Sequence, residues 1–219
     1  MKSEYHVSEI FDSIEGEGKR TGYMSVFVRL TGCNLRCSYC DTKYAQVQGR
    51  DDAEVLTDDE LLDRIRAFPW KRVTLTGGEP LLHNLKELLW RLCILGYEVN
   101  IETNGAVPLL KSRYANVFYT MDWKCPSSGE NGKMLKDNLA LLTKYDVLKF
   151  VVGNETDLNE MKRIISQYRN GSPLFYVSPV FGEIEPAEIV EYVKQNKLKD
   201  VCTQIQLHKI IWNPDARGV

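Results

Sequence analysis

The chain has 219 residues and a formal net charge of −2, with 28 lysines and arginines against 30 aspartates and glutamates. This balance gives no basic surface of the kind that wraps a nucleic acid, so we expect no nucleic-acid partner. No stretch approaches ~18 apolar residues and no apolar run follows the N-terminus, so we expect neither a membrane span nor a signal peptide, and a cytoplasmic protein.

Strand and helix patterns alternate from residue 24 onward, and the length fits one domain over residues 1–219. We expect strands at 24–30, 72–76, 97–103, 116–122, 146–153, 174–178 and 201–207. Helices are expected after a capping box at Thr57–Glu60, after a cap at Asn84, around 158–168, and over Pro186–Gln195. This alternation predicts an α/β fold with a parallel sheet. Because the chain is shorter than the ~250 residues of a full barrel, we expect a partial, open (βα)6-like TIM-type barrel.

Three cysteines lie within eight residues, at Cys33, Cys37 and Cys40. Three thiolates are one ligand too few for a closed tetrahedral zinc site, and also for an iron–sulfur cluster held by cysteine alone. A [4Fe–4S] cluster on three cysteines keeps one iron open for a second molecule. A reduced compartment disfavours disulfides, and no further cysteine pair or His-x(3–5)-His supplies zinc, so the spacing favours the cluster. The remaining cysteines are expected to be small core residues: Cys93, Cys125 and Cys202.

Polar motifs follow several expected strands, which is where α/β folds place their sites. The glycines of Gly77-Gly78-Glu79-Pro80 can bring the backbone close to a ligand, although such a pair is more often a plain turn. Asp122-Trp123-Lys124 follows a later strand, and Lys124 is equally open to the interpretation of a solvated loop lysine.

Two further features precede the cysteines. The loop at 13–18 carries acidic residues between glycines and could wrap a polar ligand, with a flexible surface turn as the alternative. Arg29 interrupts an apolar strand, so it must be paired or face a cavity. Its guanidinium suits a ligand carboxylate, while a salt bridge to a loop carboxylate is equally open.

The cysteine spacing together with Gly-Gly-Glu resembles the radical S-adenosylmethionine (SAM) superfamily. Motifs in family order over nearly the whole chain then resemble the 7-carboxy-7-deazaguanine synthase family. They are the segments 13–18, 27–42, 74–80, 101–105, 122–129 and 206–212. The resemblance implies a lyase that converts 6-carboxy-5,6,7,8-tetrahydropterin to 7-carboxy-7-deazaguanine with loss of ammonia, towards queuosine and related 7-deazapurines. The implied cofactors are a [4Fe–4S] cluster, SAM and Mg²⁺, with ring contraction begun by a 5′-deoxyadenosyl radical.

The resemblance also assigns residues to these ligands. It places the cluster on the three clustered cysteines and Mg²⁺ on Thr42. The pterin would contact Ile14, Glu15, Gly16, Arg29, Thr76 and, through a closing tail at 207–219, Val219. SAM would contact Gly78, Glu79, Asp122, Trp123 and Lys124. Glu15 departs from the glutamine often found there in relatives, which leaves its side-chain contact open.

The resemblance further implies a homodimer and an electron donor such as flavodoxin or ferredoxin. Two alternatives remain open at this point. A glycyl-radical activase has similar length and cysteine spacing but acts on a protein. A zinc-stabilised binding module would use the same cysteines without catalysis.

Overall fold

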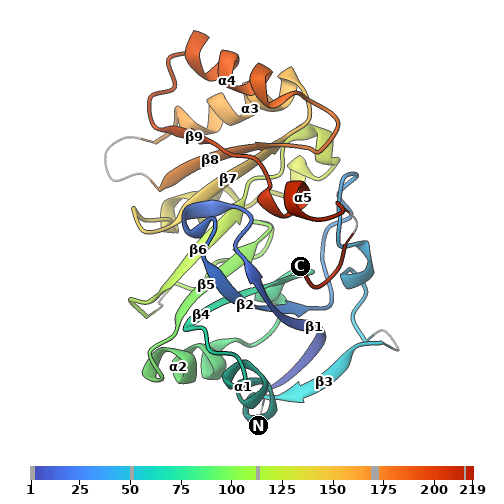
Figure 1. Ribbon diagram of the computed structural model, residues 1–219. Helices are drawn as coiled ribbons and strands as arrows, with labels where there is room; N and C mark the ends of the chain where they lie inside the picture. The colour runs from blue at the N-terminus through green and yellow to red at the C-terminus, as the bar shows by residue number, and fades with distance from the viewer. Residues whose placement is uncertain (1–2, 50–51, 112–113, 169–172, 215) are drawn as a thin grey trace.

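The structure is a computed structural model that describes residues 3–49, 52–111, 114–168, 173–214 and 216–219. Within them, one nine-stranded sheet runs in the order β3-β1-β2-β4-β5-β6-β7-β8-β9 (Figure 1). The strands are β1 Glu4–Ile14, β2 Met24–Leu30, β3 Glu54–Thr57, β4 Arg72–Gly77, β5 Glu98–Thr103, β6 Val117–Asp122, β7 Val147–Val152, β8 Leu174–Pro179 and β9 Val201–Thr203.

The helices pack on the sheet in two groups, α1 with α2 near one end and α3 with α4 near the other (Figure 1). The α-helices are α1 Asp58–Arg66, α2 Lys86–Ile94, α3 Glu155–Ile165, α4 Pro186–Gln195 and α5 Leu207–Ile211. Short 3-10 turns are η1 Gly18–Arg20, η2 Lys43–Ala45, η3 Pro80–Leu82, η4 Pro126–Ser128, η5 Asn131–Lys133 and η6 Lys136–Leu141. None of the described helices has the length and apolar content needed to span a bilayer.

The sheet confirms the open-barrel expectation. From β2 through β9 the neighbouring strands pair in parallel, while β1 and β3 add antiparallel strands beyond β2. In the described part of the chain β3 and β9 lie at opposite ends of the strand order, so the sheet does not close. The parallel strands bring their C-terminal ends to one edge, where the loops that follow them meet.

Two strands, β1 and β3, were not predicted from the sequence. In β1 the apolar alternation is broken because the register with β2 shifts between Val7 and Glu9, which hides the period of two. β3 has only four residues, too few for a pattern. The expected last strand is also shorter than predicted: it ends at Thr203, and Leu207 begins α5.

The helix boundaries follow the sequence with one exception. The capping box opens α1, with the Thr57 side chain accepting from Glu60 N and the Glu60 carboxylate accepting from Thr57 N. The expected cap at Asn84 is wrong, because α2 starts one residue later and the Asn84 amide instead donates to Ser3 Oγ, 3.4 Å away.

The described connections β5–β6 and β6–β7 hold no α-helix, so helix and strand do not alternate as regularly as predicted. Among the isolated cysteines, Cys125 is buried as expected and Cys93 packs partly against the core. Cys202 is exposed, which corrects the core assignment, because it lies on β9 at the end of the strand order.

Candidate functional site

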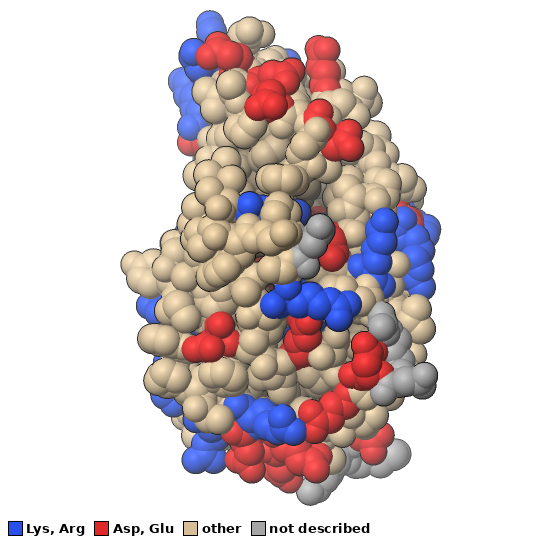
Figure 2. Space-filling model, turned by 45° about the vertical axis from the view of Figure 1, so that its right-hand side comes forward, with Lys and Arg blue, Asp and Glu red and all other residues tan. Residues whose placement is uncertain are grey.

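A cavity of about 250 Å³ opens at the edge of the sheet where the parallel strands end. Every residue expected to bind a ligand lines it except Glu79 and Trp123. Those that line it are Ile14, Glu15, Gly16, Arg29, Cys33, Cys37, Cys40, Thr42, Thr76, Gly78, Asp122, Lys124 and Val219. Figure 2 shows acidic and basic side chains close together across one face of the molecule, in keeping with the small net charge.

The three clustered cysteines are free thiols in the loop that follows β2, and all three line the cavity. Burial raises the pKa of Cys33, and burial also raises that of Cys37 to about 11 although the Lys124 ammonium opposes it. The thiols of Cys33 and Cys37 are therefore protonated at neutral pH until iron binds, since a coordinated thiol loses its proton.

The thiol arrangement is compatible with a cluster. Within the described residues no three histidine, cysteine, aspartate or glutamate side chains form a group ready to hold one metal ion. A [4Fe–4S] cluster does not need three side chains grouped around one ion, because each cysteine binds a different iron. Three half-buried thiols around one cavity match that requirement.

The Gly-Gly-Glu motif packs against the cysteine loop. Gly77 has φ +119°, and a Cβ there would lie 2.1 Å from the Leu30 carbonyl oxygen. A Cβ at Gly78 would lie 2.1 Å from the Gly32 carbonyl oxygen, so only glycines allow the end of β4 to approach this loop. The Gly78 and Glu79 N–H groups donate to Leu30 and Gly32 at 2.8 and 2.7 Å.

The Glu79 side chain is fully buried beneath the motif. Its carboxylate accepts hydrogen bonds from Leu81 N, Thr103 Oγ1 and Asn104 N at 2.7–3.0 Å. Burial raises the pKa of Glu79, and the hydrogen bonds oppose that rise. Glu79 thus joins the ends of β4 and β5 beneath the cavity, and its carboxylate is engaged by the protein itself.

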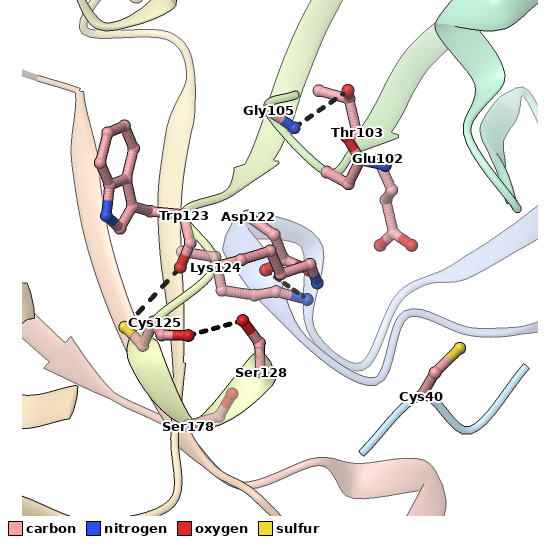
Figure 3. A network of polar contacts seen from close by, with 12 residues as sticks. Cys40, Glu102, Thr103, Gly105, Asp122, Trp123, Lys124, Cys125, Ser128 and Ser178 are labelled. Carbon is pink, nitrogen blue, oxygen red and sulfur yellow. Dashed lines mark hydrogen bonds and ion pairs between the residues drawn. The ribbon is translucent and has the colours of Figure 1, made fainter. Parts of the chain in front are cut away.

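The loop after β6 continues the alternation of the strand. The Lys124 ammonium meets Asp122 Oδ2 at 2.9 Å, and both side chains line the cavity. The indole of Trp123 points away from them (Figure 3). It donates to Glu160 Oε1 at 3.0 Å. Asp122 and Lys124 therefore face the site with their side chains, whereas Trp123 does not line the cavity and its backbone N–H donates to the Lys149 carbonyl.

The Ile14–Gly18 segment forms the opposite wall. Glu15 lies 1% exposed, and its carboxylate accepts hydrogen bonds from the Arg20 guanidinium and from Thr74 Oγ1. Its side chain is thereby held below the cavity. Arg29, both paired and facing the cavity, places Nε 3.0 Å from Glu9 Oε2 on β1. The salt-bridge partner is thus a strand residue rather than the loop carboxylate considered from the sequence.

Lys149, a charged residue absent from the expected set, lies between these walls. Lys149 of β7 places its ammonium 3.1 Å from Glu17 Oε2 and 3.4 Å from Asp122 Oδ1. Burial would raise the pKa of Glu17, but Lys149 and hydrogen bonds from Ser178 and Gln206 outweigh it and hold that pKa below its usual value. Glu17 is thus anionic at neutral pH.

Glu102 of β5 also lines the cavity, although the sequence did not predict it as a site residue. It accepts a hydrogen bond from Thr76 Oγ1 at 2.9 Å. Burial raises its pKa to about 7, although Lys149 opposes the rise. Both Glu102 and Lys149 could have been found, because each is a charge inside an expected buried strand, which is the signal that identified Arg29.

The C-terminal segment covers the site from two sides. On one side Leu207 N–H donates to the Gly16 carbonyl at 3.1 Å. On the other, Lys209 Nζ lies 3.3 Å from Asp41 Oδ2, in the cysteine loop. His208, Lys209 and Val219 all line the cavity, so the described tail forms part of its wall.

Comparison with known proteins agrees with this geometry. Residues 27–120 match the model of the radical SAM superfamily. A 7-carboxy-7-deazaguanine synthase from Clostridium acetobutylicum is 47% identical over 98% of this chain and 99% of its own length. The one from Chlorobaculum tepidum is 39% identical over 98% and 97%. A crystal structure of QueE from Escherichia coli shares the fold, with TM-score 0.78, 22% identity, and coverage of 92% and 94%.

Proposed function

This chain belongs to the 7-carboxy-7-deazaguanine synthase family, and from that premise we propose that it converts 6-carboxy-5,6,7,8-tetrahydropterin to 7-carboxy-7-deazaguanine with loss of ammonia, in queuosine or related 7-deazapurine biosynthesis. One observation carries the proposal: three free thiols and the Arg29 guanidinium line the same cavity. Thiols that could hold a cluster and a cationic group that suits a substrate carboxylate therefore line one cavity.

Cys33, Cys37 and Cys40 would hold the [4Fe–4S] cluster, and SAM would lie beside it. Asp122 and Lys124 would offer charged side chains to SAM, and Gly78 would offer its backbone. Glu79 and Trp123, whose side chains bond to Thr103 and Glu160, would support this wall from behind. When bound, the reduced cluster and SAM supply a carbon radical that abstracts hydrogen from the substrate. The protein's own contribution is position, charge and exclusion of water.

The pterin would lie on the opposite wall. Arg29 suits the substrate carboxylate, because a guanidinium holds a carboxylate through two parallel hydrogen bonds. The backbone of Ile14, Glu15 and Gly16 offers N–H and C=O groups to the polar ring, while the Glu15 carboxylate is already engaged below. Thr76 would contact the ring from β4.

Thr42 would hold Mg²⁺ together with the substrate. Its hydroxyl lines the cavity two residues after Cys40, with Oγ1 3.7 Å from the Cys40 sulfur. A single protein oxygen suits Mg²⁺, which usually keeps several waters and takes further ligands from its substrate. Mg²⁺ there would offset the charge of the substrate carboxylate.

The tail would close the site. Arg217 stacks on the Tyr44 ring, 3.4 Å from its centroid, and Val219 lines the cavity. Val219 would contact the pterin from this side. We further propose that residues 1–219 act as one radical SAM domain in a cytoplasmic homodimer, reduced by flavodoxin or ferredoxin.

The test is anaerobic incubation of the reconstituted protein with SAM, a reductant, Mg²⁺ and the carboxytetrahydropterin, followed by mass spectrometry. We expect a product with the mass of 7-carboxy-7-deazaguanine in the absence of any protein substrate. Turnover that required a second protein would favour the glycyl-radical activase. A colourless protein that held one zinc and no iron or sulfide would favour the zinc module.

A further inference from the structure

Lys149 touches both walls of the cavity. It extends from β7 with 8% of its surface exposed. Its ammonium donates to Glu17 Oε2 at 3.1 Å and forms an ion pair with Asp122 Oδ1 at 3.4 Å. Glu17 follows the segment proposed to contact the pterin, and Asp122 begins the one proposed to contact SAM. One buried cation therefore joins the two binding walls.

Each carboxylate also has support of its own. Ser178 Oγ donates to Glu17 Oε1 at 2.8 Å, and Gln206 Nε2 donates to Glu17 Oε2 at 3.2 Å. Lys124 Nζ donates to Asp122 Oδ2 at 2.9 Å. Without the Lys149 ammonium each wall would keep its own hydrogen bonds, but the direct connection between them would be lost.

A shared buried ammonium makes the order of one wall depend on the other. An ammonium removed from water needs its counter-charges, and losing one partner leaves a buried charge partly uncompensated. When a ligand orders either wall, Lys149 is ordered too. The second wall then loses less conformational entropy when its own ligand binds. A second ligand then binds more tightly, which is positive coupling between two sites.

We propose that Lys149 is a positioning residue that couples SAM binding to pterin binding by holding Glu17 and Asp122 together. The inference rests on the proposed function, with the pterin at Ile14–Gly16 and SAM at Asp122–Lys124. Because coupling is reciprocal, substrate would tighten SAM binding and SAM would tighten substrate binding by the same factor. SAM would thus be retained preferentially when the substrate is present.

The test measures affinity without turnover. SAM is titrated calorimetrically into the reconstituted enzyme with Mg²⁺ and no reductant, with and without saturating carboxytetrahydropterin. For the unmodified enzyme we expect the pterin to lower the SAM dissociation constant by about fivefold or more. In Lys149→Met, which keeps an unbranched side chain one atom shorter but removes the charge, that ratio should fall to about one while both ligands still bind.

Ser178→Ala is the matched control, because it removes a hydrogen bond to Glu17 that does not reach Asp122. It should weaken pterin binding and leave the ratio intact. Lys149→Arg, which restores a cation, should recover part of the coupling. If Lys149→Met does not retain iron, Glu17→Gln weakens the same bridge from its other end and must lower the ratio instead.

An unmodified enzyme without coupling, or a Lys149→Met variant that keeps it, overturns the inference. Neither result bears on the proposed function, which is decided separately by conversion of the carboxytetrahydropterin once reductant is added. Failure of the unmodified enzyme to convert the carboxytetrahydropterin would overturn the proposed function itself.

Discussion

The imidazole of His208 lies so close to the backbone of Gly16 that a Cβ at position 16 would come 2.0 Å from its Nδ1 atom. The Gly16 carbonyl also accepts a hydrogen bond from Leu207 N at 3.1 Å. The C-terminal segment thus docks directly on the loop proposed to bind the pterin, and glycine is needed there for space rather than for an unusual φ.

We therefore expect Gly16→Ala to displace His208 and open that side of the cavity. kcat/KM for the carboxypterin should fall roughly 10- to 100-fold, equivalent to about 1.4–2.8 kcal/mol, while iron content stays unchanged. His208→Ala supplies the control, since it removes the obstructing ring. In the His208→Ala background, Gly16→Ala should lower kcat/KM much less. If the losses in kcat/KM from the two substitutions are fully additive, the contact between Gly16 and His208 does not matter for activity.

The cluster assignment is tested cysteine by cysteine. Replacing Cys33, Cys37 or Cys40 with alanine should abolish bound iron and sulfide after anaerobic reconstitution, and with them activity, because each cysteine would bind a separate iron. Cys202→Ala is the matched control, as this thiol is exposed and lies outside the cavity. Full iron content in a variant of any of the three clustered cysteines would exclude that residue as a ligand.

The Mg²⁺ assignment predicts a difference between two substitutions of Thr42. Thr42→Ala removes the ligand oxygen and should raise the Mg²⁺ concentration needed for half-maximal activity by roughly tenfold or more, the range seen when metal-site contacts are lost. Thr42→Ser retains the hydroxyl and should stay near the unmodified enzyme. Activity would be followed after metal removal by chelation and titration with Mg²⁺. Equal Mg²⁺ curves for both variants would place the ion elsewhere.

Arg29 should matter for binding more than for chemistry. Arg29→Lys keeps the charge but loses the planar fork, so we expect KM for the carboxypterin to rise roughly 10- to 100-fold with a smaller change in kcat. Glu9→Gln separates the two roles of the arginine, because it weakens only the structural pair at 3.0 Å. A KM unchanged by Arg29→Lys would leave Arg29 as the structural partner of Glu9.

Much of the site could be predicted because parallel strands end at one edge. The cysteine loop, the Gly-Gly pair and Asp122 each follow such a strand, and the structure brings them to one cavity. The alternation of a strand, carried one residue further, would also have turned Trp123 away from Asp122 and Lys124. That inference needed only the sequence.

Other parts depend on contacts that the sequence does not display. The carboxylate of Glu79 is engaged by Thr103 and Asn104 at the end of β5, and that of Glu15 by Arg20 and Thr74. Nothing in the local motifs specifies these partners, which lie at the end of β5, in η1 and on β4. Lys149 could have been noticed as the only charged residue within β7. Its two carboxylate partners, Glu17 and Asp122, lie far from it along the chain and could not be predicted.

Glu102 predicts a pH dependence of stability. Its pKa is raised from 4.5 to about 7 in the folded protein, first because of burial. Between these values the folded state holds a proton that the unfolded state has released. The stabilisation from this group is therefore complete below about pH 4.5 and is lost as pH rises through about 7, with a slope of at most ~1.4 kcal/mol per pH unit.

Glu102→Gln should remove that slope, because glutamine is neutral throughout. Urea unfolding of the metal-free protein at intervals from pH 5 to pH 8 should show the unmodified chain losing stability relative to the variant as pH rises. Thr76→Val tests the cause, since it removes the hydrogen bond that Glu102 accepts at 2.9 Å and that opposes the rise in pKa. It should move the transition to higher pH, and a difference between Glu102→Gln and the unmodified chain that did not vary with pH would contradict the raised pKa.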